Sequence, residues 1–477
     1  MFQRNIDLKR RRKAAKAHRR ASRHRLGRLL AETLEQRIVL TQNFFPVTNT
    51  NASGAGSLAA EVALANASTD EAIVDFDPTV FGTHQTITLT ATLTLDHASE
   101  PKIPISIVGP AAGVTIAGGG SGSDFSVITV TSDTQQAAIK GDSPSAPITI
   151  TAGNLTGSSE SGAGIDDLGD LVLENVVVTN NTSAGSGGGV EVLGGPNIFT
   201  SNPGAALLAS DTTFSGNSAA GAGGGVDMEG SAALIVNSTF SGNTAGTTGG
   251  GFNNGNMLIP TFVVPLNLGV INSTFADNHA ANDGGGIDNN NGGIMGIINS
   301  VVADNTVGAS GTNPDVDGGS VYNGSSHDVI GNSNGLSGTG ISDGSNGNVV
   351  GHPALLAPLG AYGGANASGT EVSGSSVNQT IALLPGSPAI NDAVALAGLT
   401  ADASSTTTTL SAGTPLPLPS LNGSTFPYQQ GKVILIGSEK MLVTGVSGSA
   451  ASGYTLTVTR GVDGTTAAMH HALDPIF

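Results

Sequence analysis

Acidic residues at matching places in a glycine-rich sequence are the side chains best suited to chemistry in this chain. Asp227 and Asp288 each follow a glycine-rich corner by one aliphatic residue, and Asp315 and Asp317 flank Val316. Carboxylate oxygens are ligands that Ca²⁺ prefers in proteins. Acids stacked on successive turns of a repeat could therefore bind calcium, although the GGxGxDxUx nonapeptide of calcium-binding repeats is absent. These four aspartates are the candidate metal ligands, and calcium is the one cofactor that the sequence suggests.

A catalytic constellation is hard to assemble from the other residues. Asp166-Asp167 is the only adjacent acid pair in the repetitive part of the chain, and turn acids on a solvated corner are the simpler interpretation. Polysaccharide lyases typically use an Arg or Lys base, and neither residue type occurs between Lys140 and Lys432. Three histidines in this region share no spacing typical of zinc ligands. The sequence favours a protein without enzymatic activity, with a polysaccharide lyase or glycosidase as the alternative.

A motif that repeats between about residues 175 and 305 must position these groups. Each copy has a short apolar run and an asparagine, and in four of the five copies a Gly-Gly-Gly triplet ends eight residues later. The repeated residues are Asn181, Asn217, Asn243, Asn278 and Asn305, the phenylalanines Phe214, Phe240 and Phe275, and the closing glycines Gly189, Gly225, Gly251 and Gly286. The asparagines are separated by 36, 26, 35 and 27 residues, and the two long steps contain inserts. The underlying period is therefore about 26 residues.

Repeats of this length with short apolar runs and no helical spacing predict an all-β fold, a parallel β-helix solenoid. Each run is too short to bury a face alone, but coils stacked about 4.8 Å apart bury a continuous interior. We expect the repeated asparagine to take a left-handed corner conformation and its amide to form a ladder along the axis. We expect the glycines to allow a tight corner with positive φ.

The same residues resemble a known repeat family. Phe214-Ser-Gly-Asn217, Phe240-Ser-Gly-Asn243 and Phe275-Ala-Asp-Asn278, each followed by a glycine triplet, are similar to the FxxN and GGA[ILV] repeats of the polymorphic outer membrane protein family. A third glycine stands here where that family usually has alanine. The resemblance implies a right-handed parallel β-helix displayed on a cell surface, often as an adhesin.

Residues 45–394 are the expected β-helix, with a cap at 45–126 and coils at 127–394. The cap contains the one convincing helical segment, with Leu58, Val62 and Ala65 on one side. It resembles the CSLREA-type entry region found before such repeats, although the Cys and Arg of that motif are missing. A cap is also physically required, because an open coil end exposes an unpaired strand edge.

Residues 1–44 form a separate basic segment. Residues 1–41 hold 13 of the 18 Lys and Arg residues and 3 acids, a net charge of +10, while the remainder carries −28. Leu34, Glu35, Arg37 and Leu40 resemble the LEPR-XLL motif of planctomycete proteins, which implies an export or surface-sorting signal. The strongly acidic remainder disfavours nucleic acid as a partner.

The C-terminal part is predicted to contain a linker and a small domain. Residues 395–415 are rich in Ala, Ser, Thr and Pro, as linkers are. Residues 416–477 contain alternating apolar runs between Gly-Ser turns and are predicted to form a small β module, similar to those of phage-tail and surface proteins. No stretch approaches 18 apolar residues, so no transmembrane segment is expected.

These features together predict an exported protein at the cell surface or outside the cell. The expected role is structural or adhesive, with a glycan or another surface component as the partner. The alternatives are a carbohydrate-active enzyme on the same solenoid and a nucleic-acid binder that uses the basic N-terminal segment, which the charge of −28 on the remainder disfavours.

Overall fold

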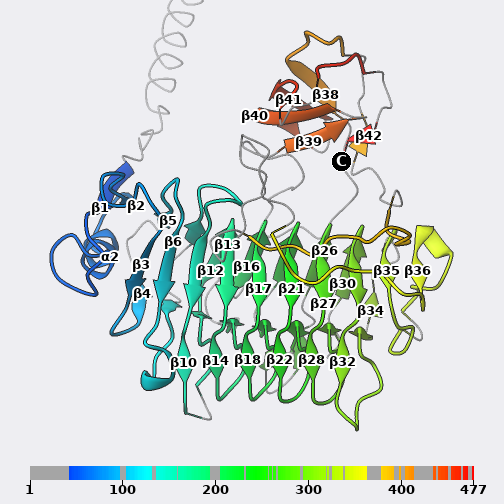
Figure 1. Ribbon diagram of the computed structural model, residues 1–477, viewed down its shortest axis with the longest axis horizontal. Helices are drawn as coiled ribbons and strands as arrows, with labels where there is room; N and C mark the ends of the chain where they lie inside the picture. The colour runs from blue at the N-terminus through cyan, green and yellow to red at the C-terminus, as the bar shows by residue number, and fades with distance from the viewer. Residues whose placement is uncertain are drawn as a thin grey trace, which may run out of the picture. The chain divides into compact units, whose positions relative to one another are not determined.

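Short strands from successive coils pair in parallel and form four long sheets (Figure 1). The structure, a computed structural model, therefore confirms the predicted all-β parallel β-helix. Leu34, Glu35, Arg37 and Leu40 lie outside the described residues. The structure describes residues 42–476 except 97–103, 132–135, 158–159, 194–204, 230–231, 256, 260–261, 265–266, 290–293, 319, 322–324, 337–338, 362–377, 391–396, 399–402, 413–432, 437–438, 450–452, 463–465 and 471–474.

Sheets A and B, as we name them, each contain ten described strands. In pairing order, sheet A consists of β1 (Gln42–Val47), β2 (Glu71–Phe76), β5 (Ile105–Val108), β8 (Ala137–Lys140), β12 (Asp170–Glu174), β16 (Ala206–Ser210), β20 (Ala232–Val236), β26 (Asn267–Ile271), β30 (Ile294–Ile298) and β34 (Ser320–Val321). Sheet B consists of β3 (Gln85–Thr88), β6 (Val114–Ala117), β9 (Ile148–Thr151), β13 (Val176–Thr179), β17 (Thr213–Ser215), β21 (Thr239–Ser241), β27 (Thr274–Ala276), β31 (Val301–Ala303), β35 (Val329–Ile330) and β36 (Val349–Val350).

Sheets C and D complete the coils. In pairing order, sheet C consists of β4 (Leu93–Leu95), β7 (Ile128–Val130), β11 (Ile165–Asp167), β15 (Val190–Val192), β19 (Val226–Met228), β23 (Phe252–Asn254), β29 (Ile287–Asp288) and β33 (Val316–Asp317). Sheet D consists of the two-residue strands β10 (Asn154–Leu155), β14 (Thr182–Ser183), β18 (Ser218–Ala219), β22 (Thr244–Ala245), β28 (His279–Ala280) and β32 (Thr306–Val307). A separate antiparallel hairpin, β24 (Met257–Ile259) and β25 (Phe262–Val264), lies within one of the two long inserts.

The interior is built from columns of apolar side chains that repeat in register from coil to coil. In sheet B, Phe214, Phe240 and Phe275 are Cα partners and are fully buried. The ring centroids of Phe214 and Phe240 are 4.4 Å apart, and those of Phe240 and Phe275 are 4.3 Å apart, in stacked geometry. Val178 and Val302 continue the column at its two ends. Burial of each such side chain stabilises the fold by about 1.5–3 kcal/mol, before the entropy of ordering is subtracted.

Left-handed residues make the corners of the coil, but they are not the repeated asparagines. The first residue of each repeat, such as Asn237 (φ 49°), is left-handed, and so is the residue before each repeated asparagine, such as Gly242 (φ 66°). Asn243 itself is not among the described residues with positive φ. The expectation of a left-handed conformation at the repeated asparagine is therefore wrong, because the residue before it makes the turn.

The three glycines of each triplet have different roles. Only the first has positive φ, as Gly249 does at 67°. The third glycine is required for close packing between coils, because a Cβ on Gly251 would lie 2.6 Å from the carbonyl oxygen of Gly286 and 3.1 Å from the Phe275 ring. Gly189, Gly225 and Gly286 face the next coil in the same way. The prediction of positive φ thus holds for the first glycine and not for the closing one.

The substitution Gly251→Ala is therefore expected to lower the free energy of unfolding by about 1–3 kcal/mol, as overpacking of a well-filled interior does. Chemical denaturation followed by circular dichroism measures the effect. Gly122→Ala is a matched control, because nothing lies within 4 Å of a Cβ added at Gly122. Equal stabilities for the two variants would contradict the proposed packing role of Gly251.

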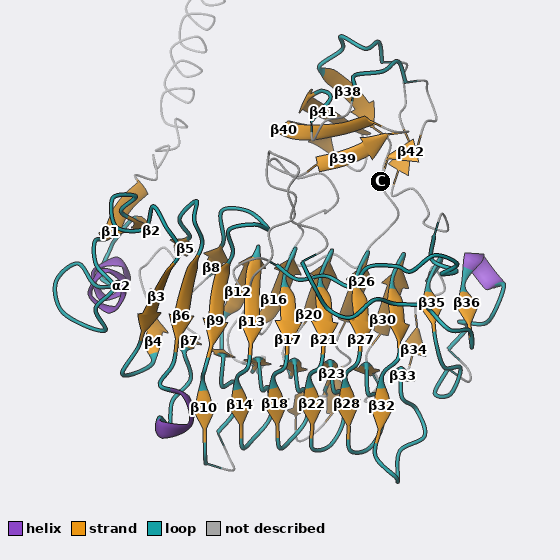
Figure 2. Ribbon diagram, in the orientation of Figure 1, coloured by secondary structure: helices purple, strands orange, loops and turns teal. Residues whose placement is uncertain are grey.

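A helix and strand β1 lie at the N-terminal end of the stack of coils (Figure 2). Helix α2 (Leu58–Asn66) begins at Ser57, whose hydroxyl accepts a hydrogen bond from the Ala60 amide at 3.2 Å. Its buried residues are Leu58, Val62 and Ala65, which confirms the predicted helix and its inner face. Strands β5 and β6 within the predicted cap already pair with coil strands β8 and β9, so regular coils begin before residue 127.

The coils end at β36, earlier than the predicted limit of residue 394. Two short 3₁₀ helices, η1 (Gly120–Gly122) and η2 (Ser345–Gly347), lie in loops. Beyond β36, residues 351–361 and 378–390 pair with each other in antiparallel fashion, with a bridge between Leu356 and Leu383. The returning segment crosses sheet B, where the Thr213 hydroxyl donates to the Gln379 carbonyl at 2.8 Å. We call residues 378–390 the strap.

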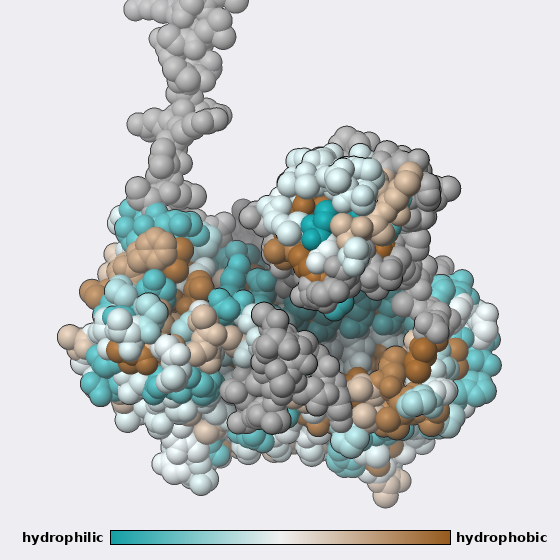
Figure 3. All heavy atoms as spheres, turned by 45° about the horizontal axis from the view of Figure 1, so that its top comes forward, coloured by the Kyte–Doolittle hydropathy of each residue, from teal (hydrophilic) through white to brown (hydrophobic). Residues whose placement is uncertain are grey.

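The exposed surface contains few charges and several apolar side chains. The face drawn in Figure 3 carries patches of hydrophobic residues between hydrophilic and weakly polar areas. Leu383 and Leu384 of the strap and Leu355 beside them are exposed. No described helix is long and apolar enough to cross a membrane.

The C-terminal part forms its own six-stranded antiparallel sheet among the described residues. In pairing order its strands are β37 (Ala397–Gly398), β42 (Pro475–Ile476), β39 (Val433–Ile436), β40 (Glu439–Ser449), β41 (Gly453–Thr459) and β38 (Thr409–Ala412). Leu410 and Leu456 are Cα partners in its small core. Strands β37 and β38 lie within residues 395–415, so the sheet begins inside the segment predicted as a linker. Threonine-rich composition is compatible with a strand as well as with a linker.

Candidate functional site

The central positions of the sheet C strands form one polar column that runs from coil to coil. In register order the column is Thr94, Thr129, Asp166, Glu191, Asp227, Asn253, Asp288 and Asp317. Apolar residues beside these positions, such as Val190 and Val192, point into the core. Consecutive side chains of the column are therefore separated by about one strand spacing, roughly 4.8 Å.

The glycine corners explain why the middle of this outward column, from Glu191 to Asp288, is buried. The first glycine of each triplet lies four residues before the column residue, and a Cβ on Gly223 would lie 2.5 Å from the Cβ of Asp227. The side chain of Asp227 therefore packs over the backbone of its own corner. Glu191, Asp227 and Asp288 are only 2%, 1% and 2% exposed.

Amide side chains separate some of the carboxylates. The Asn253 amide nitrogen donates to Asp227 Oδ1 at 2.6 Å, and the Thr248 hydroxyl donates to Asn253 Oδ1 at 3.2 Å. Farther along the stack, Asn313 Nδ2 donates to Asp317 Oδ1 at 2.8 Å. Donation by a neutral amide stabilises a buried carboxylate without adding a positive charge.

Burial dominates the electrostatics of the column. It raises the pKa of Asp166 and of Asp227 to about 6. It raises the pKa of Glu191 to about 10, and the charges of Asp227, Glu229 and Asp166 and a side-chain hydrogen bond with Asp227 add to the effect. Glu191 is therefore protonated at neutral pH, because desolvation disfavours the charged form.

A groove of about 580 Å³ opens beside Asp166 and Glu191 of the column. Five carboxyl side chains line it, from Asp124, Glu160, Asp166, Glu191 and Glu229. Four hydroxyls and three apolar side chains complete the lining, from Thr92, Ser126, Ser161 and Ser186, and from Phe125, Leu155 and Leu193. Hydroxyls, carboxyls and an aromatic ring together offer polar contacts and an apolar surface to one ligand.

The sequence interpretation of Asp166 and Asp167 as turn acids on a solvated corner is wrong. The two residues lie in strand β11, where Asp166 faces the groove and Asp167 is fully buried. Burial raises the pKa of Asp167 well above its usual range. Glu191 was missed, although it follows a glycine triplet and one valine, as Asp227 and Asp288 follow theirs. Alignment of the repeats on their glycines could have found it.

The four candidate calcium ligands are not brought together. Asp288 and Asp317 are Cα partners on adjacent strands, and Asn253 lies between Asp227 and Asp288. Asp315 lies elsewhere, at the end of the asparagine ladder. Over the described part of the chain, no three acidic, His or Cys side chains are placed to hold a metal ion together.

The repeated asparagines form a buried hydrogen-bonded ladder along the axis. Asn217 Nδ2 donates to Asn243 Oδ1 at 3.0 Å, and Asn243 Nδ2 donates to Asn278 Oδ1 at 2.8 Å. The same amide nitrogen also donates to a strand carbonyl of the preceding coil, as Asn243 does to Phe214 at 2.9 Å. Asn181 begins the ladder and Asn305 continues it in the same way.

Asp315 ends this ladder. Its Oδ1 accepts from Asn305 Nδ2 at 2.9 Å and from the Asn305 amide at 3.2 Å, and its Oδ2 accepts from the Asn332 amide at 2.7 Å. At the last position both terminal side-chain atoms accept hydrogen bonds. A carboxylate has two acceptor oxygens, whereas an amide has one oxygen and one donor nitrogen. Burial nevertheless raises the pKa of Asp315 to about 6.

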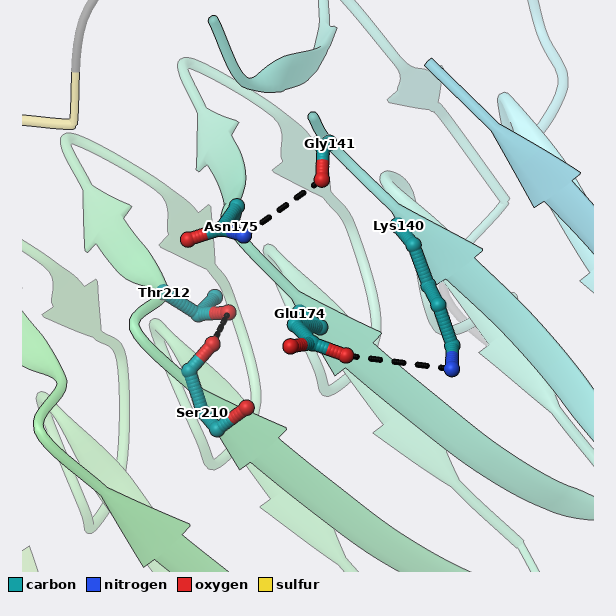
Figure 4. Close-up of polar contacts among 6 residues, drawn as sticks. All are labelled: Lys140, Gly141, Glu174, Asn175, Ser210 and Thr212. Atoms are coloured by element: carbon teal, nitrogen blue, oxygen red, sulfur yellow. Dashed lines mark hydrogen bonds and ion pairs between the residues drawn. The ribbon is translucent and has the colours of Figure 1, made fainter. Parts of the chain in front are cut away.

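Lys140 is the only Lys or Arg between residues 127 and 394, and it is paired outside the groove. Its Nζ lies 3.7 Å from Glu174 Oε2, across adjacent strands of sheet A (Figure 4). Figure 4 also shows the nearby corner, where Asn175 Nδ2 donates to the Gly141 carbonyl at 3.4 Å. An ion pair this exposed contributes about 0–1 kcal/mol. The groove lining itself contains no Lys, Arg or His.

The raised pKa values predict higher stability at about pH 5 than at about pH 7.5. Asp166, Asp227 and Asp315 have folded pKa values of about 6 against a usual 3.8, so the folded chain binds more protons between these values. The free energy of unfolding therefore falls as pH rises through this window, by up to about 1.4 kcal/mol per pH unit for each group. Urea midpoints at the two pH values measure the effect.

Asp227→Asn is the matched variant for this pH dependence, because Asn253 shows that an amide fits the same position one coil later. The variant should gain stability at about pH 7.5 and show a smaller difference between the two pH values. A wild-type midpoint that is equal or lower at about pH 5 would contradict the assignment.

Comparisons with known proteins leave the family open. No protein-family model matches the chain, and no curated protein matches it either. The class of protein defined here is therefore that of the fold, a parallel β-helix solenoid with an acidic groove beside sheet C.

Proposed function

We propose that this chain is an exported cell-surface protein of the structural or adhesive type, which binds a glycan in the groove beside sheet C. The observation that carries the proposal is the lining of the groove. Its carboxyl and hydroxyl groups match the hydroxyls of a saccharide, and the ring of Phe125 offers an apolar surface to a sugar face. A rigid stack of coils suits adhesion, because the site loses little entropy on binding.

The column of sheet C favours a linear polymer over a compact ligand. Polar side chains recur on successive coils at about 4.8 Å. Thr94, Thr129 and Asp166 continue the column from the groove toward the N-terminal coils. A chain-like glycan could therefore meet similar chemistry at several consecutive positions.

Sequence resemblances support the location. Leu34, Glu35, Arg37 and Leu40 resemble the LEPR-XLL sorting motif, and the repeats resemble those of the polymorphic outer membrane protein family. Both resemblances point to export and display on the cell surface. The CSLREA-like entry region fits the same interpretation.

A carbohydrate-active enzyme is the second candidate, and Glu191 is the observation that favours it. A carboxyl group kept protonated at neutral pH beside ionisable carboxylates is what a general acid requires. The lyase form of this alternative lacks its base, since Lys140 lies on sheet A. A glycosidase would use Glu191 as the acid, with Asp166, its Cα partner in the groove lining, as the carboxylate.

The test uses the full-length protein on an array of neutral, acidic and amino-sugar oligosaccharides. Specific binding that is lost in Phe125→Ala and kept in Phe44→Ala is expected, because Phe44 is 58% exposed in strand β1. Binding to no glycan would overturn the proposed partner. Shortened oligosaccharides after prolonged incubation would instead favour the enzyme. Fractionation of native cells, with mass mapping of the N-terminus, tests the surface location.

A further inference from the structure

We propose that the groove recognises the primary ammonium group of an amino sugar, and that Glu191 is the residue that receives it. The inference rests on the proposed glycan-binding function and names the class of saccharide. It is carried by the charge of the lining and by one unpaired oxygen atom.

The charge of the groove selects against most acidic glycans. Its lining contains the carboxyl groups of Asp124, Glu160, Asp166, Glu191 and Glu229 and no basic side chain. Uronates and sulfated sugars would place like charges in this groove without a cation to pair with them. A positively charged sugar is attracted instead, and the net charge of −28 outside residues 1–41 adds long-range attraction.

Among the residues that line the groove, one buried side-chain oxygen atom lacks a hydrogen-bond partner. Glu191 Oε2 has none, although the residue is 2% exposed and lines the groove. An unpaired buried acceptor destabilises the folded state, and a ligand donor that reaches it recovers the lost free energy. Glu191 is therefore the point in the groove where a donor on the ligand gains most.

An ammonium group fits this oxygen better than a metal ion does. A metal ion needs several convergent ligands, and the described residues contain no such group of three. An ammonium group has three N–H donors that different neighbours can satisfy. Ser161 and Ser186 hydroxyls and the Glu229 carboxyl line the same groove.

Binding is also expected to release a proton. The groups that face Glu191 are Asp166 on β11, Asp227 on β19 and Glu229 after β19, and their charges together with burial keep Glu191 protonated without a ligand. A bound ammonium group favours the ionised carboxylate, so Glu191 would give up its proton to solvent. The affinity should then rise with pH for as long as the amine of the sugar stays charged.

The test compares two probes by calorimetry with the full-length protein: a β-1,4-linked glucosamine tetramer and its fully N-acetylated counterpart. The amine form is expected to bind at least about tenfold more tightly, the free-energy difference of one charged hydrogen bond. Glu191→Gln should abolish that preference, while Glu174→Gln on sheet A should retain it. Should Glu191→Gln not fold, Glu229→Gln at the exposed side of the groove should reduce the preference several-fold.

Each other outcome overturns a defined part of the inference. Equal or tighter binding of the N-acetylated tetramer would overturn recognition of the ammonium group and leave glycan binding standing. Binding of tetralysine without binding of the glucosamine tetramer would overturn the assignment of the ligand as a saccharide. Failure of every oligosaccharide on the array would overturn the proposed function as well.

Discussion

Asn243→Ala is expected to lower the free energy of unfolding by about 4 kcal/mol, because four buried hydrogen bonds end on that side chain. Its Oδ1 accepts from the Asn217 amide at 3.1 Å and from Asn217 Nδ2 at 3.0 Å. Its Nδ2 donates to the Phe214 carbonyl and to Asn278 Oδ1. Alanine removes all four hydrogen bonds at a fully buried position, and only some of the partners keep another one, as Asn217 Nδ2 does with the Val178 carbonyl.

Urea denaturation of the full-length protein measures this loss. Thr244→Ala is the control, because Thr244 is the next residue, is exposed and lies in sheet D. Surface changes of this kind stay within about 0.5 kcal/mol of wild type. If Asn243→Ala is no less stable than Thr244→Ala, the ladder contributes nothing to stability and its buried amides must be satisfied by water.

Phe240→Ala is the second large effect, with an expected loss of about 3–5 kcal/mol. The ring is fully buried and stacks on Phe214 at 4.4 Å and on Phe275 at 4.3 Å. Its removal leaves a cavity in the middle of the column, which neighbouring coils cannot close because their backbones are fixed by sheet hydrogen bonds. Since each coil contacts only its neighbours, the damage should uncouple the coils on the two sides.

The thermal transition provides the measurement for Phe240→Ala. It should move to lower temperature and become broader, as expected for two half-solenoids that no longer melt together. Phe44→Ala is the control, since that ring is 58% exposed and should leave the transition nearly unchanged. A sharp single transition close to that of wild type would show that the phenylalanine stack is dispensable.

The fold could be predicted because its energetic unit is local in sequence. The period of about 26 residues, the Phe-x-x-Asn spacing and the absence of helical patterns lead to stacked coils without any knowledge of tertiary contacts. Helix α2 was predictable for the same reason, since Leu58, Val62 and Ala65 define its face within nine residues. These features depend on spacings shorter than one coil.

The candidate site could be predicted only in part, because it depends on register between coils. Glycine triplets align Glu191 with Asp227 in the sequence, but Asp166 follows no triplet, so its register with Glu191 is visible only in the structure. The burial of these acids was also hidden, since it arises when a glycine corner folds beneath the side chain. The sequence places an acid at a corner, but it does not say that the corner backbone lies directly against that acid.

The conformational roles of glycine and asparagine were harder to assign than their positions. Both residue types tolerate left-handed backbone, so composition alone cannot distinguish Gly249, which is left-handed, from Gly251, which is small for packing. Asn237 and Asn243 differ in the same way, because the first turns the chain and the second forms the ladder. Only contacts between coils separate these roles.

The asparagine ladder makes the solenoid directional and extensible. Every internal ladder position receives from the coil before it and donates to the coil after it, so one such unit can follow another indefinitely. Asp315 receives without donating forward, and it therefore acts as a terminator. Duplication of a whole repeat upstream of Asp315 would lengthen the rod while both ends keep their chemistry. In such an architecture, the length of the solenoid can change by duplication of repeats, because each added coil packs on its neighbours as the existing coils do.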